Sequence, residues 1–328
     1  MNRIIIILIA AFLLAPSVAC DRTRTWQKEE TIMGTVVRIT VVGKDAGPAA
    51  DALEAAFEEI RRLDRMMSLY KDESEITALN MAAGERPARV SAEMIEVMEH
   101  AASVSKMTQG AFDATAGPLI VLWQLHTRDG TVPSEREIER IRAITGWRDV
   151  EINKKRSTIF LRKKGMIVDL GGIAKGYAAD RAAAVLRSRG IENGIVAVAG
   201  DIRVMGRRPD GSPWRIAVQH PREHEKTLTV LELTDTFIST SGDYERFTIV
   251  DKKRYHHIID PRTGRPSKGV ISATIIGDRG VVVDPLTTAV FILGPEQGMA
   301  LVRKLGYDAI MVDEEGRLMS TAAVPMKE

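Results

Sequence analysis

The first half of the chain alternates between strand-like and helical patterns of hydrophobic residues. Consecutive and alternating apolar residues predict a strand over residues 31–42, with a glycine near its start. Apolar residues spaced three and four positions apart then predict an amphipathic helix over residues 47–65. Serines in N-cap position open predicted helices over residues 91–108 and 134–145, and Glu137 completes a capping box in the second.

The second half mixes strands and helices without repeats or low-complexity segments. Its predicted elements are, in order, strands between residues 150 and 170, a helix over 175–190 that Gly190 ends, strands over 194–276, helices over 284–293 and 297–305, and a closing strand over 309–313. Helices gathered early and strands spread throughout indicate a single α+β unit of two interleaved lobes.

The N-terminal segment has the pattern of a secretory signal peptide. A short basic start precedes twelve apolar residues, 4–15, which are too few to span a bilayer. Small residues then lead to Cys20, the only cysteine among 328 residues. This order resembles a bacterial lipoprotein cleavage site, although position 17 is Ser where Leu is usual. An ordinary signal peptide that leaves a free thiol is the alternative.

These features predict how the mature chain is organised and where it resides. Residues 1–19 are predicted to be the signal peptide, and Cys20 is predicted to be the lipidated first residue of the mature chain. Residues 20–30 are then expected to form a tether, and residues 31–328 a single domain. Asp21 resembles the signal that holds some lipoproteins at the inner membrane, so the expected location is its periplasmic face. A formal net charge of +2 gives no indication of nucleic-acid binding, and 45% hydrophobic residues suffice for a sizeable core.

The densest group of chemically useful side chains lies in residues 255–266. His256 and His257 follow an alternating apolar run, which places them at the end of a predicted strand. Asp260 to Gly264 then has the composition of a tight turn, with Pro in second position. A strand that delivers an imidazole to a loop rim suits a general base, whereas the alternative is a purely structural turn.

A second group lies in residues 168–177, where an apolar strand leads to Asp169, a glycine pair and a helix that begins near Lys175. Free N–H groups at such a helix start, next to a lysine, suit a phosphate group. The segment matches neither a Walker A loop nor the GxGxxG fingerprint. The alternative is a plain strand-turn-helix corner with a solvated lysine.

A third group begins at Asp284, which has the position of a helix N-cap before Pro285. Thr288 lies four residues later, on the same side of the predicted first turn. A carboxylate, a hydroxyl and a backbone carbonyl are hard ligands that suit Mg²⁺ with several retained waters. A helix cap without a metal is the alternative.

Together these segments resemble the FAD:protein FMN transferases of the ApbE type. The marks that carry the resemblance are Met33-Gly34-Thr35, Ala111 to Leu119, Asp169 to Tyr177, Gly200 to Arg203, Thr240 to Tyr244, His256 to Gly264, and Asp284 with Thr288. They follow the family's order from about residue 31 to 294. The resemblance implies a T-fold-related unit with the FAD site between its two α/β lobes.

The resemblance also implies a reaction and a set of roles. Members of the family move the FMN half of FAD to a Ser or Thr of an acceptor protein and release AMP. By resemblance, Mg²⁺ is held by Asp284, Thr288 and the carbonyl of Gly172, and His257 takes the proton of the acceptor hydroxyl. The residues implied to line the FAD site are Met33, Tyr70, Ala111, Phe112, Asp113, Asp169, Lys175 and Ile258.

Two departures and two alternative functions accompany this assignment. Ala199 stands where a Gly is usual, and Thr287 stands where some members have an acid, which leaves open whether Thr287 also contacts the metal. A Mg²⁺-dependent FAD pyrophosphatase would use the same phosphate site, and a flavin-binding lipoprotein without catalysis would need no base. The implied acceptors are exported subunits of redox-driven ion pumps or other respiratory flavoproteins. The sequence determines neither the particular acceptor nor the oligomeric state.

Overall fold

One long antiparallel sheet organises the molecule. The computed structural model describes residues 23–223 and 225–321, so the predicted signal peptide and Cys20 lie outside the described residues. The eight strands are, from one edge to the other, β1 (Arg24–Ile32), β2 (Thr35–Gly43), β6 (Gly194–Val198), β7 (Asp201–Met205), β10 (Phe237–Gly242), β15 (Val270–Gly277), β16 (Asp308–Asp313) and β17 (Leu318–Ser320). Each neighbouring pair is antiparallel.

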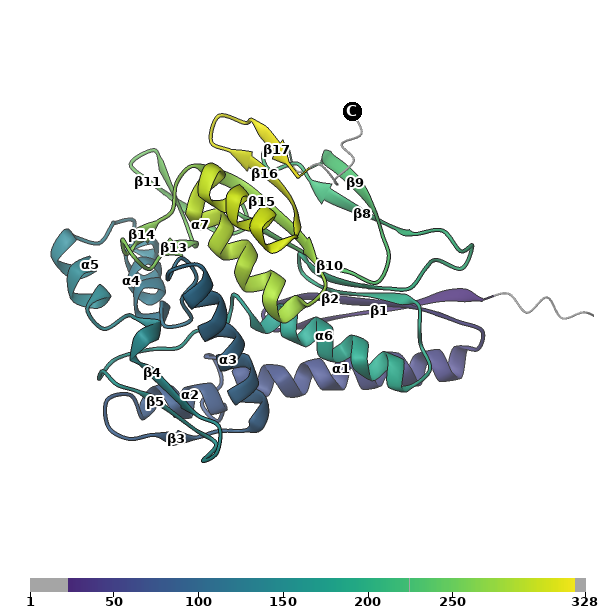
Figure 1. Ribbon diagram of the computed structural model, residues 1–328, viewed down its shortest axis with the longest axis horizontal. Helices are drawn as coiled ribbons and strands as arrows, with labels where there is room; N and C mark the ends of the chain where they lie inside the picture. Colours follow the sequence, from purple (N-terminus) through teal and green to yellow (C-terminus); the bar gives the residue numbers. More distant parts are fainter. Residues whose placement is uncertain (1–22, 224, 322–328) are drawn as a thin grey trace, which may run out of the picture.

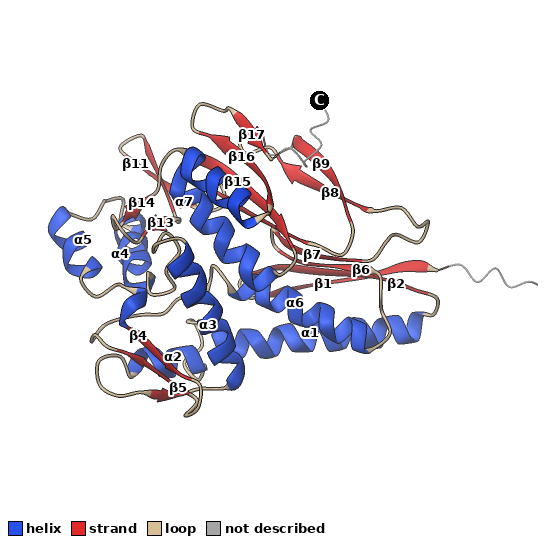
Figure 2. Ribbon diagram, viewed as in Figure 1, coloured by secondary structure: helices blue, strands red, loops and turns tan. Residues whose placement is uncertain are grey.

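Three long helices cover one face of this sheet (Figure 2). They are α1 (Ala46–Met67), α6 (Ala174–Ser188) and α7 (Gly280–Leu305). Strand residues alternate between faces, and those on the opposite face contribute to a second apolar cluster with the hairpin of β8 (Trp214–Gln219) and β9 (Thr227–Leu233). The central part of the sheet is therefore covered on both faces.

Residues 68–173 form a second lobe between α1 and α6 (Figure 1). Its elements are α2 (Glu75–Met81), β3 (Ala88–Arg89), α3 (Ala92–Met107), α4 (Gly117–Arg128), α5 (Glu135–Arg142), the 3₁₀ turn Trp147–Asp149, β4 (Val150–Asn153) and β5 (Thr158–Leu161). Leu79 and Met94 of this lobe belong to the same buried cluster as Phe57 and Val196 of the sheet lobe. The two lobes thus share one core, and the predicted single α+β unit is confirmed.

Two small hairpins complete the fold near α4 (Figure 1). They are β11 (Phe247–Val250) with β12 (Lys253–His256), and β13 (Ile259–Asp260) with β14 (Arg265–Pro266). They carry the histidine-rich segment. In the ranges that the structure describes, no helix combines the length and the apolar character needed to cross a bilayer.

Several predicted helix ends are confirmed by their capping contacts. Ser91 Oγ accepts a hydrogen bond of 3.1 Å from Met94 N at the start of α3. Ser134 and Glu137 form both contacts of a capping box. Gly190 follows α6 with a φ of +78°, the left-handed conformation that ends helices.

The prediction for the first strand was wrong in two respects. Residues 31–42 are not one strand, because Met33 and Gly34 form the two-residue turn of a hairpin with φ values of +56° and +68°. The strand before this turn, β1, begins at Arg24 and is an edge strand of the sheet. Residues 24–30 therefore belong to the domain and not to a tether.

Two helices also differ from the prediction. Helix α4 had not been predicted, although Pro118 occupies its first turn. Helix α7 begins at Gly280 with Arg279 as N-cap, so Asp284 is not an N-cap. The predicted break between two helices is present as a non-helical residue, Gly294, with φ of 82° and ψ of 179°.

Candidate active site

A lysine and two aspartates from three elements form the centre of the site. Lys175 of α6 donates a hydrogen bond to Asp201 at the start of β7, and its Nζ lies 3.9 Å from Asp284 Oδ1 of α7. Both carboxylates are buried, and Asp201 Oδ1 also accepts a hydrogen bond of 2.6 Å from Ser239 Oγ of β10. The three side chains bring two negative charges and one positive charge together.

The pKa values of these groups reflect that crowding. Burial, followed by repulsion from Asp201, raises the pKa of Asp284 to about 7. Burial alone would lower the pKa of Lys175, but the attraction of Asp201 and Asp284 outweighs it and raises that pKa. Lys175 is therefore charged at neutral pH.

Asp284 does cap a helix, but it is the neighbouring one. Its Oδ2 accepts a hydrogen bond of 2.9 Å from Gly176 N in the first turn of α6. Ala174 N is also engaged, in a hydrogen bond of 2.8 Å to Leu170 O. The expectation of free N–H groups at this helix start is thus wrong for these two positions, since local contacts already satisfy them.

Close packing of two glycines sets the spacing between α6 and α7. A β-carbon built on Gly176 would lie 2.3 Å from Gly280 O, and one built on Gly280 would lie 2.4 Å from Gly176 O. Only glycine fits at either position without a shift of the backbone. This contact holds Lys175 and Asp284 opposite each other.

The remaining predicted metal ligands lie next to this cluster. A β-carbon built on Gly172 would lie 3.7 Å from Thr288 Oγ1 and 3.2 Å from Phe112 Cε2, so all three residues adjoin. Thr288 Oγ1 is 3.5 Å from Ser241 Oγ of β10. Thr287 is fully buried, and its hydroxyl donates a hydrogen bond of 2.7 Å to Val283 O within the helix.

The segment from Ala111 to Asp113 lies beside Asp169 in the second lobe. Asp169 N donates a hydrogen bond of 2.7 Å to Ala114 O, and its Oδ1 accepts one of 2.7 Å from Gly171 N. Both carboxylate oxygens of Asp113 are engaged, by Thr115 and by Trp147 N, while burial raises the pKa of Asp113. Ala111, Phe112 and Asp113 are buried, so this segment shapes the wall of the site.

His257 follows the end of β12 with a defined tautomer. Its Nδ1 lies 3.1 Å from the carbonyl oxygen of Arg246, which only accepts, so Nδ1 carries the proton and Nε2 keeps its lone pair. Burial, followed by the nearby Arg246 cation, lowers the pKa of His257 to about 4. Lys175 contributes to the same shift, which places its charge within electrostatic range of the imidazole.

His256 has a different environment, as expected for adjacent residues of a strand. Its Nε2 lies 2.9 Å from Ser267 O, its ring makes an edge contact with Phe291 at 5.6 Å, and burial lowers its pKa. His256 is thus held in the protein interior. The predicted turn after it is present as well, because Arg262 N donates to Asp260 Oδ1 and Gly264 has a φ of +71°.

The other predicted FAD-site residues are distributed unevenly. Ile258 is buried, and Met33 packs against the main core from the tip of the first hairpin. Tyr70, in contrast, is 88% exposed in the loop after α1, and the structure shows no ring contact between it and another described residue. Its assignment remains a prediction from the resemblance.

The structure also identifies site residues that the sequence did not assign. Asp201 and Ser239 complete the cluster around Lys175, Ser241 adjoins Thr288, and Arg246 contacts His257. Asp201 and Ser241 lie in segments that carry the family resemblance, which was the available signal for them. Nothing in the sequence indicates that Arg246 would approach His257, since this depends on the β11–β12 hairpin.

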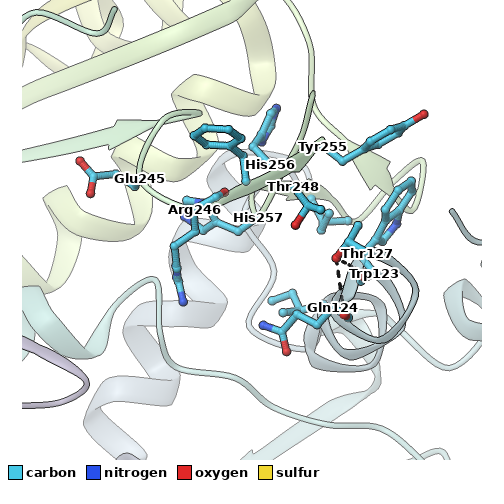
Figure 3. Close-up of a pocket in the computed structure, with 12 residues that line it drawn as sticks. Trp123, Gln124, Thr127, Glu245, Arg246, Thr248, Tyr255, His256 and His257 are labelled. Carbon is cyan, nitrogen blue, oxygen red and sulfur yellow. Dashed lines mark hydrogen bonds between the residues drawn. The ribbon is translucent and has the colours of Figure 1, made fainter. Parts of the chain in front are cut away.

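The described residues contain no group of three or more His, Cys, Asp or Glu side chains suited to a metal ion. A pocket of about 390 Å³ does lie beside His257, between α4 and the β11–β12 hairpin (Figure 3). Arg246 and His257 line it together with aromatic side chains of both elements. The site therefore has an ionic part at α6 and α7 and a more apolar part at α4.

Comparisons with known proteins identify the family of the chain. Residues 33–311 match the model of the ApbE family. The FAD:protein FMN transferase of Vibrio cholerae is 34% identical over 85% of this chain and 85% of its own. The protein of the same description from Escherichia coli K12 is 32% identical over 94% of this chain and 92% of its own.

Solved structures show the same likeness. An ApbE protein of Thermotoga maritima superposes with a TM-score of 0.85 and 33% identity, covering 91% of this chain and 97% of its own. The flavin transferase ApbE of Vibrio cholerae superposes with a TM-score of 0.83 and 31% identity, and the match covers 92% of this chain and 98% of that protein. On this match over most of its length, together with the shared fold, the chain belongs to the ApbE family.

Proposed function

We propose that the protein transfers the FMN moiety of FAD to a serine or threonine hydroxyl of an exported acceptor flavoprotein and releases AMP. The observation that carries this proposal is the cluster of Lys175, Asp201 and Asp284 beside Thr288, within electrostatic range of His257. The similarity to proteins described as FAD:protein FMN transferases supports it.

The reaction is a displacement at phosphorus. The acceptor Oγ forms a new bond to the phosphorus of the FMN half, and the bond from that phosphorus to the bridging oxygen breaks, so that AMP leaves. His257 Nε2 accepts the hydroxyl proton, a role for which its Nδ1 contact to Arg246 O fixes the tautomer. Lys175 and Arg246 stabilise negative charge on the phosphates.

We further propose Mg²⁺ as the cofactor, held by Asp284, Thr288 and the carbonyl of Gly172. These oxygen donors fit the ion, because Asp284 is a buried carboxylate whose pKa is raised to about 7 by burial and then by repulsion from Asp201, so a cation beside it would be favourable. When bound there, a divalent cation neutralises the pyrophosphate and makes AMP a better leaving group. Asp284 Oδ2 keeps its contact to Gly176 N and leaves Oδ1 as the ligand atom.

A first experiment mixes the chain with FAD, MgCl₂ and an acceptor domain that carries a Ser/Thr flavinylation motif. Intact mass of the acceptor and AMP release are then measured. An acceptor heavier by one FMN, with an equal amount of AMP, supports the transferase. Free FMN with AMP and an unmodified acceptor would instead favour the pyrophosphatase, and intact bound FAD without AMP a flavin carrier.

We also propose that the mature chain begins at a lipidated Cys20 on the periplasmic face of the inner membrane. The signal-like segment, the single cysteine and Asp21 support this location. The Cys20→Ala variant should lose membrane association, and fractionation of cells followed by immunoblotting measures this. A variant that remained in the membrane fraction would argue against the lipid anchor.

A further inference from the structure

The pocket beside His257 has two walls from distant parts of the chain. Helix α4 supplies Ile120, Trp123, Gln124 and Thr127, and the β11–β12 hairpin supplies Phe247, Thr248 and Tyr255 among others. In Figure 3 the Trp123 and Tyr255 rings lie on one side of the pocket, and Arg246 with His257 on the other. The pocket thus connects an aromatic surface directly to the candidate base.

Its size and lining suit part of a peptide and not a dinucleotide. Its volume of about 390 Å³ lies near the lower end of the range for small-molecule sites, about 300–1,000 Å³. Trp123 and Tyr255 stack with ring centroids 5.5 Å apart, which gives a flat apolar wall. Lys175 and Asp284, which form the ionic part of the site, do not line it.

Polar side chains in the pocket are available for new hydrogen bonds. The Gln124 carboxamide and the Thr248 hydroxyl line the pocket, and neither has a hydrogen-bond partner within the described ranges. A peptide backbone offers the donors and acceptors that such groups pair with. The pocket therefore combines an apolar wall with polar side chains that can pair with the backbone of any peptide, a combination that suits a peptide-binding groove.

The two elements that form the walls of the pocket, α4 and β11, also carry exposed apolar side chains. Val121 and Leu125 of α4 are 41% and 48% exposed, and they are four residues apart, on one side of the helix. Phe247 and Ile249 of β11 are 41% and 63% exposed and share one face of the hairpin. Of these four residues Phe247 lines the pocket itself, and exposed apolar residues on the elements beside a pocket are typical of an interaction surface.

We propose that this pocket binds the segment of the acceptor protein next to the serine or threonine that receives FMN. An apolar side chain of that segment packs against Trp123 and Tyr255, which brings the acceptor hydroxyl to His257 Nε2. Val121, Leu125 and Ile249 contact the acceptor's surface around this segment. The inference rests on the proposed transferase function and adds to it how the acceptor is recognised.

Two substitutions test the pocket in the full chain. Thr248→Trp fills it, and Phe247→Asp places a charge on its apolar side; both positions are at least partly exposed, so the fold should tolerate them. Leu318→Asp, at a 43% exposed position of β17, is the matched control. The acceptor is a soluble flavoprotein domain with a Ser/Thr flavinylation motif, and FAD affinity is measured separately by fluorescence.

Both pocket variants should raise the KM for the acceptor tenfold or more, leave the dissociation constant of FAD within twofold of wild type, and melt like the control. An unchanged acceptor KM in both variants would overturn the inference, and so would a tenfold loss of FAD affinity, since the pocket would then belong to the flavin. A wild-type chain that binds FAD but modifies no acceptor would instead refute the transferase function, and this inference with it.

Discussion

Lys175, Asp201 and Asp284 bring one more negative charge than positive charge into a largely buried place. Burial, followed by repulsion from Asp201, raises the pKa of Asp284 to about 7. A nearby cation stabilises the ionised form of such a buried carboxylate, because the electrostatic attraction offsets the hydration that the carboxylate loses on burial. The same imbalance makes Asp284 the residue whose charge the proposed chemistry depends on most.

The Asp284→Asn variant should therefore lose FMN transfer by roughly 100-fold or more, while its melting temperature stays near that of wild type. The amide keeps an acceptor for Gly176 N and removes only the charge. Transfer is measured by acceptor mass, and unfolding by calorimetry. Asp313→Asn, at a buried aspartate of β16, is the control; normal transfer in Asp284→Asn would remove the proposed metal site.

His257 should be neutral in the flavin-free protein throughout the physiological range. Its pKa of about 4 follows from burial and from Arg246, whereas an unfolded chain titrates near 6.5. Because the folded pKa is the lower one, the neutral ring stabilises the fold fully above pH 6.5, and this contribution falls as the pH approaches 4. NMR titration of the imidazole should give a midpoint well below 6; a midpoint above 6.5 would contradict this environment.

The His257→Ala variant should bind FAD as wild type does and transfer FMN about 10²- to 10⁴-fold more slowly. Bound phosphates attract a proton, so FAD raises the pKa of the imidazole towards the range in which a general base works best. Flavin fluorescence reports binding, and acceptor mass reports transfer. His220→Ala, in the loop after β8, is the control and should behave as wild type, and normal transfer in His257→Ala would mean that the base lies elsewhere.

At the residue scale, the sequence predicted local conformation better than it predicted which distant side chains contact each other. The turn after Asp260 and the separate roles of His256 and His257 followed from local composition and strand alternation. The pairing of Lys175 with Asp201 could not be predicted locally, because 26 positions separate them and only the sheet brings them together.

Among the secondary-structure elements, the pair α6 and α7 determines the geometry of the ionic site. Gly176 and Gly280 bring the two helix backbones into direct contact, and Lys175 and Asp284 lie on either side of that contact. A larger residue at either glycine would push the helices apart and lengthen the distance between the two charged groups.

The Gly280→Ala variant should cost about 1–3 kcal/mol of stability and lower the transfer rate. Gly47→Ala is the matched control, since a β-carbon there meets no atom within 4 Å and the position lies in α1. Thermal unfolding and the transfer assay measure both effects. If Gly280→Ala were as stable and active as Gly47→Ala, the contact between Gly176 and Gly280 would not determine the spacing of α6 and α7.

The sequence predicted elements with capping signals and missed those without them. Ser91, Ser134 and Gly190 indicated helix ends that the structure confirms. Helix α7 begins four residues before the predicted start. The sequence does not indicate this earlier start, because the run from Gly280 to Val283 has the β-branched composition of a strand. The Met33–Gly34 turn was read as strand because the apolar pattern continues on both sides of it.

At the scale of the whole molecule, one buried cluster extends through both lobes. Within the second lobe, the Asn80 side chain of α2 donates to Val168 O at 3.0 Å and accepts from Val168 N at 2.8 Å, which joins this helix to the segment that leads into α6. The two lobes should therefore unfold together. The α+β class and the single unit were predictable from the order of elements, whereas the order of strands in the sheet was not, because no local pattern specifies which distant strands pair.

Calorimetry of the chain should thus show a single transition in which the van't Hoff and calorimetric enthalpies agree. A shared core makes separate unfolding of residues 68–173 unfavourable, because it would expose apolar surface of both lobes. Two resolved transitions would show instead that the lobes are independent cooperative units.

The candidate site draws on Lys175 of α6 and on Asp284 and Thr288 in the last long helix. Nearly the whole polypeptide must therefore be synthesised before its ligand atoms can meet, and contacts so distant in sequence form late and slowly. A ribosome that stops before codon 284 yields a chain that lacks both the carboxylate and the hydroxyl of α7. Under the proposed mechanism, nascent and truncated chains that end before residue 284 therefore lack groups that the transfer needs.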